Sequence, residues 1–223
     1  MPANILRPGV EEIVIPAGSV SLPGLLAYPE NACGLVLFAH GSGSSRLSVR
    51  NNRVAADLRA GGLGTLLFDL LTEDEAQARV NVFDIPLLAD RLLAAVAWIR
   101  KFDPDASLGF FGASTGAAAA LVAAATLGTV VRAVVSRGGR PDLASDDLAR
   151  VTAPTLLIVG GNDRDVLALN QEALARLTCE KRLVVVPGAG HLFEERGTLD
   201  EVSSLAQHWF VTHLPVMPSH SRG

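Results

Sequence analysis

Short runs of consecutive apolar residues alternate along the chain with longer segments in which apolar residues recur at helical spacing. The short runs predict strands at 12–15, 25–28, 35–39, 65–70, 108–111, 133–136, 155–159 and 183–186. The longer segments predict helices at 48–60, 85–102, 115–127, 166–177 and 200–214. Because this alternation is typical of βαβ units, we expect an α/β fold with a mostly parallel sheet.

The residue types within these runs refine the expected layers. From residue 35 onward the strand segments are apolar at successive positions, as expected when helices cover both faces of a sheet. The first two strands are separated by a segment with glycine and proline around 18–24, which predicts an antiparallel hairpin at an edge of the sheet. Segment 115–127 is almost all Ala, Val and Leu, so we expect a central helix buried on most sides.

A length of 223 residues fits one domain, 1–223, with a core at about 10–214 and a flexible tail at 215–223. The composition is 49% hydrophobic, which is ample for a large core. A net charge of −4 gives no reason to expect nucleic acid as a partner, because phosphates are bound by clustered Lys and Arg.

The sequence also indicates the compartment. The N-terminus lacks the basic segment and apolar run of a signal peptide, and the longest apolar stretch, 116–128, is too short to span a bilayer. Cys33 and Cys179 are expected to be free thiols in a reducing compartment. The five histidines show no metal-ligand spacing. We therefore expect a cytoplasmic protein with neither a metal site nor a membrane partner.

The segment 108–117, LGFFGASTGA, contains a G-x-S-x-G match between a predicted strand and a predicted helix. A nucleophile elbow requires such a sharp turn, with a strained serine at its apex. Gly112 and Gly116 remove side chains that would collide where the chain folds back. Ser114 is therefore the candidate nucleophile, and a small-residue turn that only closes a βα unit is the alternative.

A serine hydroxyl becomes a good nucleophile only when a histidine, oriented by an acid, removes its proton. Asp163 follows strand 155–159 in the sequence GGND, and His191 follows strand 183–186 in PGAGH. The order Ser, Asp, His, with each residue at a strand end, is that of α/β-hydrolases. Asp163 has an alternative as a helix cap, with Asp165 competing for both roles, and His191 has one as a surface loop histidine.

Acyl transfer also needs two preorganised donors for the oxyanion. One is expected to be the backbone N–H of Thr115, which follows the nucleophile. The other is expected from the loop HGSGSS at 40–45, at the N–H of Ser42. A plain flexible turn is the alternative for this loop. We expect His40 to be a strand-end residue whose ring bonds the backbone.

With these segments, the chain resembles the α/β-hydrolase superfamily, and specifically its small dienelactone hydrolase-like branch, over about 10–214. The resemblance rests on the sequences HGSG at 40–43, GASTG at 112–116, GGND at 160–163 followed by Val166, and GH at 190–191. It implies an eight-stranded, mostly parallel sheet with helices on both faces, and a hydrolase without a cofactor. Dienelactone hydrolase carries a cysteine at the nucleophile position, where this chain has Ser114. A generic ester is therefore the expected substrate.

Other residues at the same edge are candidates for binding that substrate. Arg137 ends a strand and would hold a carboxylate or phosphate group, with a loop-stabilising ion pair as the alternative. Ser44 and Arg46 belong to a polar, basic patch after the oxyanion loop, for which helix capping and solvation are the alternative. Residues 71–83 are long enough to shape the pocket, and the lack of a large cap elsewhere predicts an open site.

The sequence thus predicts a serine hydrolase that cleaves small or medium carboxylic esters through an acyl-enzyme, as a monomer or homodimer. Hydrolysis of an amide, peptide or thioester by the same three residues is the alternative within enzymes. Nothing in the sequence decides among these leaving groups. A non-catalytic binding domain on the same scaffold is the alternative from another class, because fold does not fix function.

Overall fold

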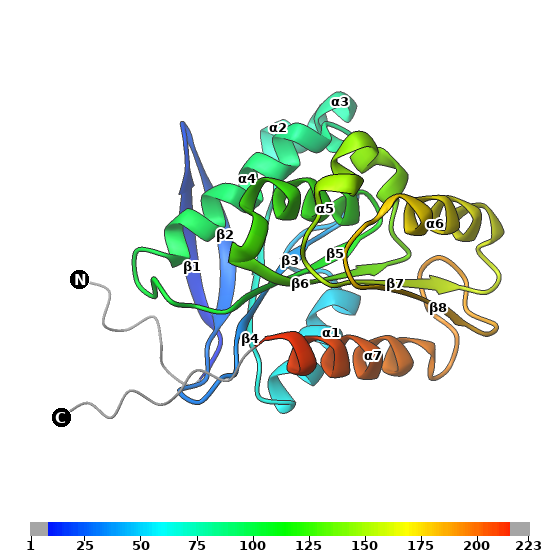
Figure 1. The fold of residues 1–223 in the computed structure, drawn as a ribbon. Helices are drawn as coiled ribbons and strands as arrows, with labels where there is room; N and C mark the ends of the chain where they lie inside the picture. The colour runs from blue at the N-terminus through cyan, green and yellow to red at the C-terminus, as the bar shows by residue number, and fades with distance from the viewer. Residues whose placement is uncertain (1–8, 215–223) are drawn as a thin grey trace.

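The computed structural model describes residues 9–214 and contains one eight-stranded sheet (Figure 1). The strand order is β1-β2-β4-β3-β5-β6-β7-β8. β2 is antiparallel to both of its neighbours, and strands β3 to β8 are mutually parallel. The mostly parallel sheet and the antiparallel edge hairpin predicted from the sequence are confirmed. The strands are β1 (Glu11–Ala17), β2 (Val20–Ala27), β3 (Leu35–Ala39), β4 (Gly64–Phe68), β5 (Leu108–Ala113), β6 (Val131–Arg137), β7 (Thr155–Gly160) and β8 (Lys181–Val186).

Helices cover both faces of this sheet (Figure 1). Leu35 and Leu37 of β3 belong to the apolar cluster shared with α4 and α5, whereas Val36 and Phe38 pack with α1 and α7. Successive residues of a central strand are therefore all buried, which explains the unbroken apolar runs. One face carries α4 (Ile85–Ile99), α5 (Thr115–Leu127) and α6 (Arg164–Arg176), and the other carries α1 (Val49–Ala60) and α7 (Thr198–His213).

Four short helical segments were not predicted. Three of them, α2, α3 and η1, bury no residue, so no apolar periodicity in the sequence indicates them. The longest, η2, begins with a proline and follows the loop after β6. These segments are α2 (Glu73–Gln77), α3 (Arg79–Val82), η1 (Gly128–Val130) and η2 (Pro141–Arg150).

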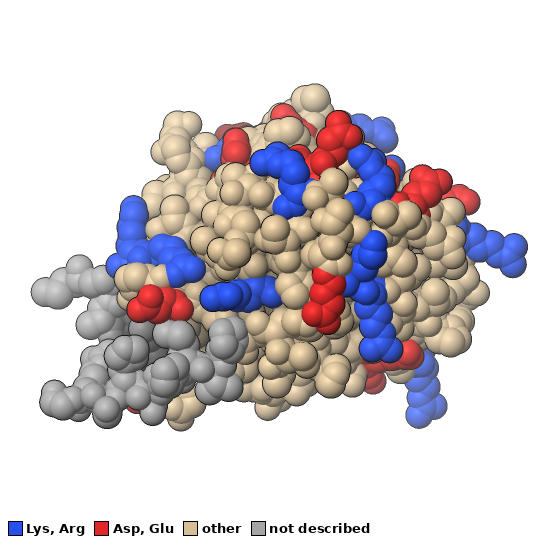
Figure 2. Space-filling view, in the orientation of Figure 1, with Lys and Arg blue, Asp and Glu red and all other residues tan. Residues whose placement is uncertain are grey.

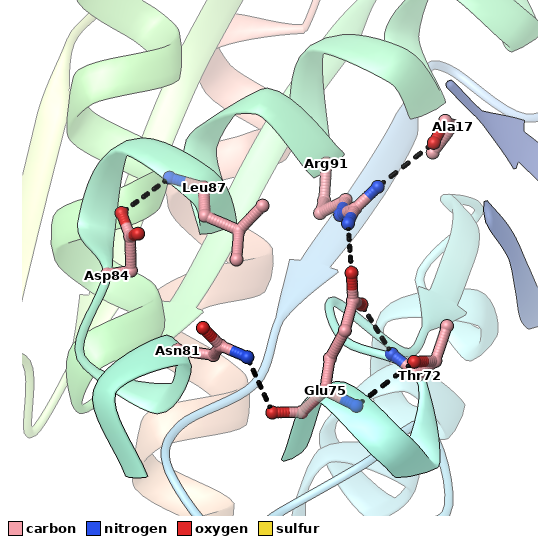
Figure 3. Close-up of polar contacts among 7 residues, drawn as sticks. All are labelled: Ala17, Thr72, Glu75, Asn81, Asp84, Leu87 and Arg91. Carbon is pink, nitrogen blue, oxygen red and sulfur yellow. Dashed lines mark hydrogen bonds and ion pairs between the residues drawn. The ribbon is translucent and has the colours of Figure 1, made fainter. Parts of the chain in front are cut away.

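The segment that carries α2 and α3 is held by hydrogen bonds centred on Glu75 (Figure 3). The backbone N–H of Thr72 donates to Glu75 Oε2 at 2.9 Å, and the Glu75 N–H donates to Thr72 Oγ1 at 3.2 Å, which forms a capping box. Arg91 of α4 donates to Glu75 Oε1 at 2.6 Å and to the carbonyl of Ala17 at 3.0 Å. Asn81 donates to the Glu75 carbonyl at 2.9 Å. This cluster joins α2 and α3 to α4 and to the end of β1.

The surface offers little sign of a highly charged partner. Figure 2 shows acidic and basic side chains interspersed over one face, with uncharged residues between them. Within residues 9–214, no helix is both long and apolar enough to cross a membrane, and no group of three His, Cys, Asp or Glu is placed to hold a metal ion. The tail predicted to be flexible, 215–223, lies outside the described residues.

The parallel strands determine where chemistry can occur. Because β3 to β8 run in one direction, their carboxyl ends open at the same edge of the sheet. Ser42 follows β3, Ser114 follows β5, Arg137 ends β6, Asp163 follows β7 and His191 follows β8. The fold therefore gathers at one edge residues that are far apart in the sequence.

Candidate active site

Ser114 occupies a sharp turn between β5 and α5. Its φ of 51° and ψ of −124° lie in a region that residues other than glycine rarely adopt. The Ser114 carbonyl accepts the N–H of Ala117 at 3.1 Å and that of Arg140 at 3.0 Å, while the Ser114 N–H donates to the Arg137 carbonyl at 3.4 Å. These bonds from α5, β6 and the loop after β6 hold the strained residue in place.

The glycines of the motif are required by close backbone contacts. A Cβ on Gly116 would lie 2.2 Å from the carbonyl oxygen of Ala39, which real side chains do not tolerate. A Cβ on Gly41 would lie 2.8 Å from Cβ of Ser114. The loop after β3 therefore runs directly against the candidate nucleophile, as an oxyanion loop must.

His191 and Asp163 are hydrogen-bonded to each other, with 2.6 Å between Nδ1 and Oδ2. Since a carboxylate only accepts, Nδ1 carries the proton and Nε2 is left as an acceptor. Asp163 precedes α6 at the N-cap position, but its side chain makes no capping bond. Asp165, the competing candidate, lies exposed in the first turn of α6. The structure thus brings His191 to Asp163 and not to Asp165.

The loops that carry the acid and the histidine are bound to each other. The N–H of Asn162 donates to the Ala189 carbonyl at 2.9 Å, and the Asn162 side chain donates to the Gly188 carbonyl at 2.8 Å. These two bonds join the segment after β7 to the segment after β8. They fix the relative positions of the two side chains.

The two expected oxyanion donors are free to act. Among residues 9–214, neither the N–H of Ser42 nor that of Thr115 donates to a backbone carbonyl. The start of the loop is fixed by His40, whose Nδ1 donates to the Gly41 carbonyl and whose Nε2 accepts the Leu70 N–H, both at 3.0 Å. Burial lowers the pKa of His40, so the ring stays neutral and can accept. His40 is therefore a structural residue, as predicted.

The far end of the oxyanion loop is held by Asp69, which the sequence reasoning missed. Asp69 lies just after β4, accepts the Arg46 N–H at 2.6 Å and forms an ion pair with the Arg46 guanidinium. Asn52 of α1 donates to the Arg46 carbonyl at 2.8 Å. Arg46 is thus engaged with the scaffold and does not line the pocket. The sequence signal that could have indicated Asp69 is a single carboxylate directly after an apolar strand.

A pocket of about 540 Å³ opens beside Ser114. His191 and Arg137 line it together with the oxyanion loop, which includes Ser44, and with the first turn of α1. Leu47, Val49 and Leu192 give it a partly apolar lining. Residues 71–83, which we expected to shape the pocket, contribute none of its lining.

Arg137 differs from the other polar residues of the pocket because it is buried, with 8% of its surface exposed. Its Nε and Nη1 have no hydrogen-bond partner within the described part of the chain. The loop-stabilising ion pair that was the alternative for this residue is not formed among residues 9–214. Burial, with a smaller effect of the Arg50 charge, lowers the pKa of Arg137 to about 10, so it is still protonated at neutral pH.

The family follows from comparison with known proteins. The model of the dienelactone hydrolase family matches residues 70–212. The chain belongs to this family. A crystal structure of dienelactone hydrolase from Anabaena variabilis ATCC 29413 is 52% identical, with a TM-score of 0.90, and the match covers 93% of this chain and 99% of that chain. Est1E from Butyrivibrio proteoclasticus shares the fold at 17% identity, with a TM-score of 0.77 over 91% of this chain and 98% of that chain.

The family match and the fold agree with each other, since the dienelactone hydrolase structure covers nearly the whole of this chain. A further relative is longer. A Mycobacterium tuberculosis protein named "Putative phosphoribosyl transferase" is 59% identical over 206 residues, which are 92% of this chain and 46% of that protein. The chain therefore spans about half the length of the curated relatives it matches.

Proposed function

We propose that this protein hydrolyses small or medium carboxylic esters with Ser114 as the nucleophile. The observation that carries the proposal is the 2.6 Å hydrogen bond from His191 to Asp163, because His191 also lines the pocket that contains the strained Ser114. A histidine oriented by a carboxylate has its second nitrogen available as a general base. Free N–H groups at Ser42 and Thr115 complete the requirements for acyl transfer.

The proposed reaction proceeds in two steps. Nε2 of His191 takes the proton from Ser114 Oγ as the oxygen attacks the ester carbonyl, and the resulting oxyanion accepts the N–H groups of Ser42 and Thr115. The alcohol leaves with the proton from His191, and a water molecule activated by His191 then releases the acid. The described residues show no hydrogen bond between Ser114 and His191, so the proposal requires this bond to form when substrate binds.

Ester cleavage is proposed over amide or peptide cleavage because an alcohol is more readily displaced than an amine and the pocket is open. Thioester cleavage by the same three residues is the alternative that a substrate panel would separate. The name of the Mycobacterium tuberculosis relative does not change this proposal. The matched residues make up 46% of that protein and fold here as a hydrolase. We therefore propose no phosphoribosyl transfer for this chain.

The test is covalent labelling with a fluorophosphonate, followed by peptide mapping. We expect one adduct, on Ser114, and turnover of p-nitrophenyl acetate and butyrate that falls by about three orders of magnitude or more in Ser114→Ala. Ser145 is a matched control, because its φ of 46° and ψ of −121° reproduce the backbone of Ser114 outside the pocket. An unlabelled Ser114 in the folded protein, or full activity of Ser114→Ala, would refute the proposal.

A further inference from the structure

Arg137 is a buried cation without a partner of opposite charge. Its exposed fraction is 8%, and no carboxylate within residues 9–214 forms an ion pair with it. A buried charge that lacks compensation is costly, and proteins normally pair it with a side chain or a ligand. Arg137 lines the pocket beside Ser114, where a substrate group is able to reach it.

The surroundings of Arg137 are positive as well. None of the described residues that line the pocket is acidic. Arg50 lines the same pocket, and its ion pair with Glu194, at 2.9 Å, involves exposed side chains, so solvent screens it. The 12-residue helix α1 directs its N-terminus to the pocket, where Val49 and Asn51 are also part of the lining. The N-terminus of a helix attracts anions because its dipole is positive and its first N–H groups have no partner within the helix. In α1 the Ser48 hydroxyl accepts the Asn51 N–H at 3.3 Å, so the attraction comes from the dipole and the remaining N–H groups of the first turn.

The number and spread of donors favour phosphate over carboxylate. A carboxylate is neutralised by one guanidinium group. A phosphate monoester carries a charge of about −1.5 to −2 at pH 7 and offers three acceptor oxygens. Two arginines, a helix N-terminus and the hydroxyl of Ser44 match the larger charge and the greater number of acceptors.

We propose that Arg137, with Arg50 and the N-terminus of α1, binds a phosphate group on the substrate. This inference rests on the proposed hydrolysis at Ser114 and specifies its substrate class, a carboxylic ester of a phosphorylated small molecule. The bond that breaks is the carboxylic ester, and water supplies the oxygen of the acid and the proton of the alcohol. The phosphate group is bound and is not transferred.

Three acetyl esters that differ in one group test this inference. The first ester is ethylene glycol with acetate at one end and phosphate at the other. The second carries a methyl ether in place of the phosphate. The third is acetyl glycolate, which carries a carboxylate. We expect kcat/KM of the wild type to be about 10- to 100-fold higher for the phosphate ester than for the ether, the usual range for charge-assisted hydrogen bonds. Arg137→Met should remove most of this preference.

Two further variants make the comparison specific. Arg53→Met removes the same charge from α1, but Arg53 pairs with Asp200 and does not line the pocket, so the phosphate preference should stay at the wild-type value. Arg50→Met should lower the preference less than Arg137→Met, and it provides a second measurement if Arg137→Met does not fold. A phosphate preference that persists in both Arg137→Met and Arg50→Met would overturn the inference. The inference would also be overturned if Arg137 increased kcat/KM for acetyl glycolate but not for the phosphate ester.

Binding without turnover separates this inference from the proposed function. Calorimetry with inorganic phosphate and the Ser114→Ala protein should show binding that Arg137→Met abolishes. If neutral esters are cleaved at Ser114 but phosphate does not bind, the phosphate site is wrong and the hydrolase stands. If phosphate binds through Arg137 but no ester is cleaved, the anion site stands and the proposed reaction is wrong.

Discussion

Two arginines of this protein, one partly buried and one buried, lie in very different regions. Arg91 belongs to the cluster beneath α2 and α3, where its side chain is 11% exposed and donates to Glu75 and to the Ala17 carbonyl (Figure 3). Arg137 lies in the pocket at the carboxyl edge of the sheet, is buried and has neither an ion pair nor a hydrogen bond for Nε and Nη1 among the described residues.

The difference separates a structural cation from one suited to a ligand. The charge of Arg91 is neutralised inside the protein, so its contribution is to stability. The charge of Arg137 is not neutralised by another of the residues that the structure describes, so burying this charge lowers the stability of the ligand-free protein. Functional sites commonly reduce stability in this way, because groups held ready for a substrate cannot also satisfy one another. We therefore expect substitutions at the carboxyl edge to change activity and substitutions in the Arg91 cluster to change stability.

The largest expected effect is a loss of activity, without a loss of stability, when the acid at the carboxyl edge of the sheet is replaced. Asp163→Asn should lower kcat by about four orders of magnitude, because the amide no longer holds His191 with Nδ1 protonated. Its free energy of unfolding, measured in urea, should change by less than about 1 kcal/mol, since the side chain caps no helix. Asp165→Asn, two residues on, is the control and should keep full activity. Equal losses in both variants would contradict the assignment of the acid.

Next in size is the effect of Arg91→Met, which should act on stability alone. It leaves the partly buried Glu75 carboxylate without its partner, so we expect the free energy of unfolding to fall by about 2–3 kcal/mol. Arg137→Met removes an uncompensated charge and should leave this free energy unchanged or raise it. Adding Glu75→Gln to Arg91→Met should recover part of the loss. If Arg137→Met were less stable than Arg91→Met, Arg137 would be a structural residue, and the proposed difference between the two arginines would be wrong.

A smaller effect on kcat is expected when the partner of Arg46 is replaced. Arg46 is paired with a carboxylate, as Arg91 is, but it lies at the same edge of the sheet as Arg137. It lies at the catalytic edge but is paired with Asp69, and this pair holds the oxyanion loop. Asp69→Asn should therefore lower kcat by about tenfold through a displaced Ser42 N–H, with a smaller change in KM. Asp147→Asn, which breaks a surface pair with Arg150, should alter neither parameter. An unchanged kcat in Asp69→Asn would show that the loop is held by other contacts.

The smallest effect concerns backbone strain. Ser114 and Ser145 share nearly the same unfavourable φ and ψ, and glycine adopts such angles without steric cost. Ser114→Gly and Ser145→Gly should each raise the free energy of unfolding by up to about 1 kcal/mol. Only Ser114→Gly should lose activity. If Ser145→Gly raises the free energy of unfolding and Ser114→Gly does not, contacts of the Ser114 side chain itself stabilise the folded protein.

The main strands and helices were predictable because their apolar periodicity is a local property of the sequence. The candidate residues Ser114, Asp163 and His191 were predictable for a related reason, since each follows a recognisable strand. The partners of the charged residues were not predictable from the sequence. Whether Arg137 or Arg46 meets a carboxylate depends on what the fold brings near it, and only the structure showed Asp69 beside Arg46. Segments α2 and α3 were missed because hydrogen bonds around Glu75, and not an apolar face, hold them in place.

The carbonyl oxygen of Arg137 accepts the N–H of Ser114, while the side chain of the same residue lines the pocket. The first contact uses only the main chain, so any amino acid at position 137 that keeps the strand can make it. Evolution can therefore exchange the side chain at this position without moving Ser114. Under the proposed phosphate site, a change in this single codon would alter which substrates bind and keep the contact that positions Ser114.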